Sequence, residues 1–320
     1  MPGVTGPAIV AVGEGMLELS KGMPGLASWH LQHGGDTLNA ATYLARLGHR
    51  VGYLTALGRD NLSCEMRRAW AEEGIDTTLV LTHPDKLPGL YLIETDLDGE
   101  RTFLYWRENS AARALFECEG ADAALAHAAR ADCLYLSGIT LSLFDERGRE
   151  RLAELCKDVR DRGGMVVFDP NYRPRGWWSN IEAQAAIARV APSVSIALPT
   201  LADEDLLYGD GSVEACRSRW NAAGVREVAI KLGGKGVVVC VGDLATTVSI
   251  QENMAPRDTT GAGDAFNAAY LSARLAGRVP VDAARAGNAL AAEVVRHPGA
   301  IISRTAMLSV QKVLTASIGV

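Results

Sequence analysis

The chain has 320 residues and a formal net charge of −6; 48% of its residues are hydrophobic and 22% are charged. This composition supplies a large core and is not that of a disordered or collagen-like chain. The negative charge disfavours nucleic acids and anionic membrane surfaces as partners, because both favour clustered Lys and Arg side chains.

Three features of the sequence predict where the protein works. No stretch approaches the roughly 18 to 20 consecutive apolar residues that a membrane-spanning helix needs. The N-terminal apolar run has no basic segment before it and is followed by acidic Glu14 and Glu18, unlike a secretion signal. The six cysteines, at positions 64, 118, 133, 156, 216 and 240, show no Cys-x-x-Cys spacing, which is typical of reduced thiols. We therefore expect a cytoplasmic enzyme with no membrane or nucleic-acid partner.

The first segments of the chain alternate between strand-like and helix-like patterns. An apolar run over 8–13 predicts a strand, and apolar side chains at helical spacing follow the pair Gly34-Gly35. A second strand and a second helix are predicted at 51–57 and 62–73. This alternation is typical of a parallel sheet covered by helices.

A predicted hairpin then interrupts the alternation. The strand-like runs 90–95 and 101–106 are joined by a segment containing Asp98-Gly99, which favours a tight hairpin turn. A parallel sheet built from strand–helix units does not need such a hairpin, so we interpret it as part of a small lid. We predict one folding unit over 1–320, with a β-sheet lid formed by about 14–35 and 88–110.

The remaining segments resume the alternation. Strands are predicted at 133–137, 165–169, 195–198, 227–231 and 236–241, and helices at 146–162, 181–191, 214–223, 263–277 and 282–297. Together the patterns predict an α/β fold with a central, mostly parallel sheet, helices on both of its faces and a small β-sheet lid.

The segment Gly261-Ala262-Gly263-Asp264 precedes the last-but-one helical pattern. Two glycines allow a tight turn, and the free N–H groups and positive dipole end of a helix that starts here suit a phosphoryl group. A carboxylate at Asp264 could accept the proton of an alcohol that attacks phosphorus. The alternative is that Asp264 only caps the helix and that the glycines form an ordinary turn.

Three blocks of the sequence resemble one known family. The segment 258–266 resembles the C-terminal signature of the ribokinase (PfkB) carbohydrate kinases, and Gly34-Gly35-x-x-x-Asn39 resembles their sugar-binding signature. The segment 231–236 resembles their nucleotide loop. No P-loop is present, and Gly13-Glu14-Gly15 lacks the third glycine of a dinucleotide-binding fingerprint. The resemblance implies a ribokinase-like fold, ATP as phosphoryl donor and a divalent metal such as Mg²⁺.

The resemblance also implies roles for individual residues. Asp264 would be the general base, and the backbone amides of Gly261, Ala262, Gly263 and Asp264 would form the anion hole. The nucleotide would contact Lys231, Gly233, Gly236, Gly261, Gly263 and Asn288. For Asn288 the alternative is an ordinary solvated residue on a helix.

The metal environment departs from the family pattern. Members commonly carry Asn-x-x-Glu before the nucleotide loop, whereas this chain has Thr200-Leu201-Ala202-Asp203-Glu204. Asp203 can still hold a metal ion indirectly, through bound water, but Thr200 is a poorer match. In some relatives a monovalent cation such as K⁺ is present, and here Asp258 and Thr260 would help to coordinate it.

Two arginines indicate the class of sugar. Tyr105 and Arg107 point to the same side of a predicted lid strand, where an aromatic ring and a guanidinium group suit a carboxylate. Arg173 follows a predicted parallel strand, at the end where such sheets bind ligands. Two converging arginines favour a sugar acid over a neutral sugar. The alternatives are a surface ion pair of Arg107 with Glu108 or Glu100, and a phosphate contact or a loop anchor for Arg173.

Within the family, the blocks 34–39, 105–107 and 171–175 resemble the 2-keto-3-deoxygluconate kinases. This resemblance implies ATP-dependent phosphorylation of the terminal hydroxyl of 2-dehydro-3-deoxy-D-gluconate. The residues that would contact this sugar acid are Gly34, Gly35, Asn39, Tyr91, Tyr105, Arg107, Arg173 and Asp264. The alternatives are another PfkB kinase, such as a 5-keto-2-deoxygluconate kinase or a fructokinase, and a non-catalytic sugar-acid sensor. As in several relatives, the lid would also support a homodimer.

Overall fold

The computed structural model describes residues 8–21, 28–95, 101–250, 256–308 and 310. Its main sheet has the strand order β14-β13-β12-β11-β10-β9-β1-β4-β5, and β6 also pairs with β4. The pairings from β12 across to β5 are parallel, whereas β12, β13 and β14 pair antiparallel. The predicted central, mostly parallel sheet is therefore confirmed.

The strands of this sheet are β1 (Ile9–Val12), β4 (Val51–Leu57), β5 (Ile75–Asp76), β6 (Val80–Thr82), β9 (Cys133–Ser137), β10 (Met165–Asp169), β11 (Ile196–Ala197), β12 (Glu227–Lys231), β13 (Val237–Val241) and β14 (Leu244–Val248). The helices are α1 (Asp36–Arg46), α2 (Asn61–Glu72), α3 (Ala121–Ala128), α4 (Gly138–Ser142), α5 (Glu146–Asp161), α6 (Asn180–Val190), α7 (Leu201–Tyr208), α8 (Val213–Ala222), α9 (Ala262–Leu275) and α10 (Pro280–Val294). Of these elements, β5, β6, β14, α3, α4 and α7 were not predicted, and most of them are short.

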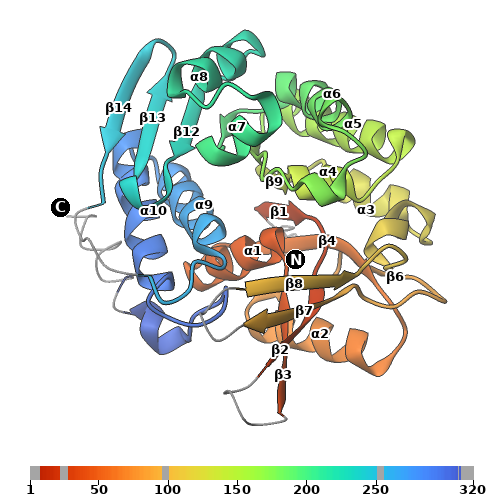
Figure 1. The fold of residues 1–320 in the computed structure, drawn as a ribbon. Helices are drawn as coiled ribbons and strands as arrows, with labels where there is room; N and C mark the ends of the chain where they lie inside the picture. The colour runs from red at the N-terminus through yellow and green to blue at the C-terminus, as the bar shows by residue number, and fades with distance from the viewer. Residues whose placement is uncertain (1–7, 22–27, 96–100, 251–255, 309, 311–320) are drawn as a thin grey trace, which may run out of the picture.

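Helices cover both faces of the sheet, so its central strands are apolar on both sides. All four residues of β1 are buried, and alternate ones enter different cores. Val10 and Val12 pack with α5, α6 and α8, whereas Ile9 and Ala11 pack with α1, α9 and α10. Figure 1 shows these two groups of helices on opposite sides of the sheet. Burial on both faces explains why the predicted strands are continuous apolar runs.

A separate sheet of four strands, which we call the lid, lies beside the main one (Figure 1). It contains β2 (Met16–Lys21), β3 (Trp29–Gly34), β7 (Leu90–Thr95) and β8 (Arg101–Trp106), in the order β3-β2-β7-β8. The antiparallel pairing of β7 with β8 confirms the predicted hairpin, although Asp98-Gly99 lies outside the described residues. In the part of the chain that the structure describes, we find no helix with the length and apolarity to span a bilayer.

Candidate active site

The predicted anion hole lies at the start of α9. Gly261 precedes the helix with a left-handed φ of 72°, and a Cβ on it would lie 2.7 Å from Cα of Ala300. Only glycine fits such a backbone without strain or a clash. The first N–H groups of α9 have no partner within the helix and point out of its N-terminus. The local structure therefore matches the turn predicted from the two glycines.

Asp264 lies in the first turn of α9 and is buried. Its Oδ2 accepts a hydrogen bond of 2.8 Å from Nδ2 of Asn39, which lies on α1. That helix begins after Gly35, whose φ of 149° again requires glycine, and a Cβ on Gly35 would overlap the carbonyl oxygen of Glu14. The fold thus brings together two predicted site residues that are 225 positions apart.

The surroundings of Asp264 raise its pKa to about 7. Burial is the largest cause, and the neighbouring carboxylates of Asp36 and Asp169 add to it, whereas the Asn39 hydrogen bond and the charge of Lys231 oppose it. Burial also raises the pKa of Asp36, whose carboxylate accepts a hydrogen bond from Asn171. A carboxylate with a pKa near neutrality is well suited to act as a general base at physiological pH.

The predicted nucleotide loop has two distinct parts. Lys231 ends β12 and is buried, with its Nζ 2.7 Å from Oδ2 of Asp169. The turn after it is closed by a hydrogen bond from Leu232 N to the Gly236 carbonyl oxygen. Both Gly233 and Gly236 have left-handed φ values, of 60° and 98°, which explains the need for glycine there.

Asn288 lies on α10 beside this turn. It is buried rather than solvated, and its Nδ2 donates a hydrogen bond of 3.0 Å to the carbonyl oxygen of Val248. A Cβ on Gly236 would overlap the same carbonyl oxygen. Asn288 and the Gly233–Gly236 turn are therefore neighbours, although they are far apart in the sequence.

The inner face of the lid carries aromatic side chains. The Tyr91 ring lies 6.0 Å from Tyr105 between ring centroids, and the Tyr105 ring stacks on Phe103. The Tyr91 hydroxyl donates to the buried carboxylate of Glu18, and a Cβ on Gly34 would overlap this hydroxyl. Tyr91, Tyr105 and Gly34 are therefore brought together by the lid.

Both predicted arginines pair with carboxylates. Arg107 forms an ion pair with the buried Glu14, which was not among the acidic partners considered from the sequence. The Glu108 carboxylate instead accepts the backbone N–H of Arg107, and Glu100 lies outside the described residues.

Arg173 donates to Oδ2 of Asp203 at 3.0 Å and to the carbonyl oxygen of Tyr172 at 2.7 Å. Burial lowers the pKa of Arg173, but the carboxylates of Asp203, Asp169 and Asp264 outweigh it and raise that pKa. Arg173 is therefore anchored by its own loop, as the alternative from the sequence expected, and by the carboxylate predicted to reach the metal.

Two further features concern cations and cavities. Within the described ranges, no group of three or more His, Cys, Asp or Glu side chains is arranged to hold a metal ion. Asp258 accepts backbone N–H bonds from Thr260 and Gly299.

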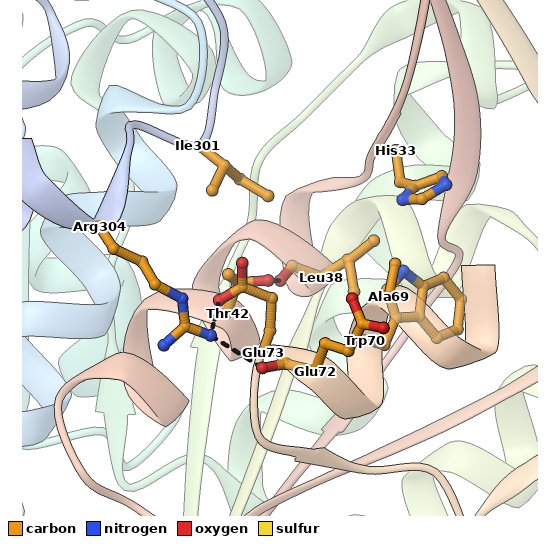
Figure 2. A pocket seen from close by; sticks show the side chains of 9 residues that line it. All are labelled: His33, Leu38, Thr42, Ala69, Trp70, Glu72, Glu73, Ile301 and Arg304. Carbon is orange, nitrogen blue, oxygen red and sulfur yellow. Dashed lines mark hydrogen bonds and ion pairs between the residues drawn. The ribbon is translucent and has the colours of Figure 1, made fainter. Parts of the chain in front are cut away.

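A cavity of about 290 Å³ lies elsewhere, between α1, α2 and the C-terminal segment (Figure 2). Its lining includes Trp70, Glu73 and Arg304 and none of the predicted site residues.

The residues predicted from the sequence did not include a buried polar cluster that lies beside Asp264. It comprises Asp169, Asn267 and Tyr135, which are 3%, 0% and 1% exposed. Asp169 is the last residue of β10, at the carboxyl edge of the sheet, where ligands bind. This position in the sequence could have indicated that Asp169 belongs to the site. Asn267 interrupts the apolar run Ala265-Phe266-x-Ala268-Ala269, which was the signal for an inward-facing polar group.

Comparison with known proteins gives the family. The model of the pfkB family of carbohydrate kinases matches residues 9–307. The chain is 43% identical over 308 residues to the 2-dehydro-3-deoxygluconokinase of Dickeya dadantii, covering 93% of this chain and 98% of that protein. It is 31% identical to the Bacillus subtilis protein of the same name, covering 89% of this chain and 85% of that protein.

Solved structures agree on the fold. A PfkB protein from Polaromonas superposes with a TM-score of 0.81 at 25% identity, covering 97% of this chain and 99% of that one. A putative ribokinase II from Escherichia coli in complex with ATP and Mg²⁺ also gives 0.81, at 20% identity, covering 95% and 98%. The ribokinase-like fold predicted from the sequence is confirmed. The chain belongs to the pfkB family of carbohydrate kinases and is a sugar kinase.

Proposed function

We propose that this kinase transfers the γ-phosphoryl group of ATP to the terminal hydroxyl of 2-dehydro-3-deoxy-D-gluconate. The observation that carries the proposal is the buried Asp264 at the start of α9, held by Asn39 in a chain that is 43% identical to a kinase named for this sugar acid. The proposal is supported by the block 34–39 that first indicated this substrate, because its Asn39 donates a hydrogen bond to Asp264.

In the proposed reaction Asp264 removes the proton of the hydroxyl group. The hydroxyl oxygen then forms a bond to the γ-phosphorus, and the bond between that phosphorus and the β–γ bridging oxygen breaks, releasing ADP. The backbone amides of Gly261, Ala262, Gly263 and Asp264 stabilise the charge on the transferring group. With a pKa near 7, Asp264 is partly ionised at neutral pH and largely ionised at slightly basic pH, and it remains basic enough to accept a proton.

We assign the nucleotide to the side of α9 that faces β12 and α10. Gly233, Gly236 and Asn288 lie together there, beside the carbonyl of Val248. Mg²⁺ bound with the nucleotide would neutralise phosphate charge, and Asp203 is the carboxylate that would hold it through water, since Mg²⁺ keeps several waters. A monovalent cation such as K⁺ at Asp258 and Thr260 remains a prediction.

We assign the acid end of the sugar to Arg107 and Arg173. Arginine presents paired N–H donors to a carboxylate, and each of these residues already binds one, Glu14 or Asp203. Tyr91 and Tyr105 would cover the carbon chain from the lid, and Gly34, Gly35 and Asn39 would contact it from the start of α1.

The substrate is tested with a panel of sugars in a coupled ADP assay. We expect kcat/KM for 2-dehydro-3-deoxy-D-gluconate to exceed that for fructose by at least about a hundredfold, since fructose has no carboxylate for the two assigned arginines to bind. Arg173→Met should remove most of this preference by weakening the sugar acid alone, while Arg189→Met on the surface of α6 should not change it. A wild-type preference for fructose or 5-keto-2-deoxygluconate would contradict the proposed substrate.

We also propose that two copies of the chain pair through the outer face of the lid. Leu31, Leu19, Leu92 and Leu104 lie directly opposite one another across the four strands, so they share one face. Leu31 and Leu104 are 49% and 41% exposed, and Trp106 on the same face is 54% exposed. A row of exposed apolar residues suits a second copy of itself, because a two-fold interface pairs the same patch on both subunits.

The dimer is tested by light scattering during size-exclusion chromatography. We expect about twice the 34.0 kDa chain mass for the wild type. Leu104→Glu should reduce this to one chain mass, because a charge would be buried without a partner. Leu244→Glu, at an exposed leucine on β14, is the control and should leave the dimer intact. A monomeric wild-type protein at micromolar concentration would contradict the interface.

A further inference from the structure

A buried lysine lies directly beside the turn that begins α9. The ammonium Nζ of Lys231 lies 3.7 Å from the position that a Cβ on Gly263 would take. Lys231 is only 7% exposed, and its side chain reaches Asp169 at the end of β10. Because Gly263 has no side chain, nothing at that position separates the ammonium group from the predicted anion hole.

Two acceptors fix the position of this ammonium group. Nζ of Lys231 donates to Oδ2 of Asp169 at 2.7 Å and to Oδ1 of Asn267 at 3.1 Å. Asn267 itself donates to Asp169 at 2.6 Å and to the Tyr135 hydroxyl at 3.0 Å. Among the residues described, only Asp169 and Asn267 accept hydrogen bonds from Nζ, and a lysine has three N–H donors. One donor is therefore left for a ligand.

A single helix positions both this lysine and the predicted base. Asp264 and Asn267 lie three residues apart on α9, so they project from the same side of the helix. The charge of Lys231 is felt at Asp264, where it opposes the effect of the neighbouring carboxylates. The ion pair with Asp169 is neutral overall, but its positive end faces the first turn of α9.

We propose that Lys231 binds the phosphoryl group during its transfer from ATP, and that Asp169 and Asn267 are positioning residues for it. The inference rests on the proposed ATP-dependent transfer but not on which sugar accepts the phosphoryl group. Lys231 keeps its proton and donates a hydrogen bond to a phosphoryl oxygen. A fixed donor of this kind stabilises charge that develops in the transition state without reorganising during the reaction.

The proposal is tested with Lys231→Met, which removes the charge but keeps an unbranched side chain. The assay uses whichever sugar the wild-type enzyme phosphorylates best, at saturating sugar and ATP. We expect kcat to fall by about a hundredfold or more, while the Kd of ADP, measured by calorimetry, changes by less than about threefold. Asn267→Leu should lower kcat by about tenfold with the same unchanged Kd, because it loosens the lysine without removing it.

The pH dependence of kcat/KM measures the effect of the Lys231 charge on the predicted base. Lys231 lowers the pKa of Asp264, so the loss of its charge raises that pKa and moves the acidic limb of the profile to higher pH. Lys157→Met, which removes an exposed lysine paired with Asp161 on α5, is the control and should change neither kcat nor the pH profile.

Two results would overturn the proposal. One is a Lys231→Met enzyme with kcat within about threefold of the wild type. The other is a slow enzyme that has also lost ADP binding and unfolds at a lower urea concentration, since that would assign Lys231 a structural role. If the wild type prefers a different sugar, the proposed substrate fails, but the comparison of Lys231 variants on that sugar is unaffected.

Discussion

Asp264→Asn should lower kcat by at least about a hundredfold, which corresponds to roughly 3 kcal/mol in the activation barrier. The amide has the same shape and can still accept the hydrogen bond from Asn39, but it cannot take a proton from the sugar hydroxyl. In the wild type, kcat/KM should fall as the pH drops below about 7, because Asp264 becomes protonated there. The measurement is a coupled ADP assay from pH 6 to pH 9.

Measurements of unfolding show whether the Asp264→Asn enzyme loses activity because it lacks the base or because it is less stable. The folded-state pKa of Asp264 is raised, so the folded protein holds this proton more tightly than the unfolded chain does. The resulting stabilisation is present at low pH and is lost as the pH rises through about 7. Asp264→Asn should therefore be at least as stable as the wild type at pH 8, as measured by urea unfolding.

A matched control is available in the first turn of α10. Asp282 occupies that turn and pairs on the surface with Arg285. Asp282→Asn should leave kcat unchanged. Equal turnover by Asp264→Asn and the wild type would show that Asp264 only caps its helix, which was the alternative considered from the sequence.

Gly261→Ala should lower kcat by about a hundredfold and also destabilise the fold. The added methyl group would lie 2.7 Å from Cα of Ala300, and the φ of 72° is unfavourable for alanine. The turn would have to move, and with it the amides that we assign to the phosphoryl group. The measurements are kcat at saturating substrates and the free energy of unfolding in urea.

The other end of α9 offers the control for this substitution. Gly277 also has a left-handed φ, of 79°, but a Cβ on it would meet no described atom within 4 Å. Gly277→Ala should cost about 1 kcal/mol of stability from the backbone alone and leave kcat unchanged. A Gly261→Ala enzyme with full activity would exclude this turn as the anion hole.

The sequence predicted those parts of the site that depend on local backbone geometry. The sequence predicted a turn at Gly261 and a helix start after Gly35. The structure has both, and each glycine has a positive φ that other residues rarely adopt. The alternation of strands and helices was also sufficient to predict the main sheet. The short strands β5 and β6 carry too few residues for a periodic pattern, so they were missed.

The partners of charged side chains could not be predicted in the same way. The ion pair of Arg107 joins the end of a lid strand to Glu14 at the end of β1, and no local spacing relates the two. Asp169 and Asn267 are buried polar residues whose roles depend on Lys231, which reaches them from a third element. Such contacts are set by the order of strands in the sheet, which the sequence pattern alone leaves open.

The side chains along β8 alternate between the two faces of the lid, so this one strand contributes to both the proposed sugar contact and the proposed subunit contact. Tyr105 shares the face of Tyr91, whereas its neighbours Leu104 and Trp106 lie on the opposite face with Leu92. Inserting or deleting one residue in this strand would exchange the two faces, so that leucine and tryptophan would take the side now occupied by the tyrosine. Under the two proposals above, a single-residue length change in β8 would alter both the sugar contact and the subunit contact, whereas a substitution on one face would alter only one of them.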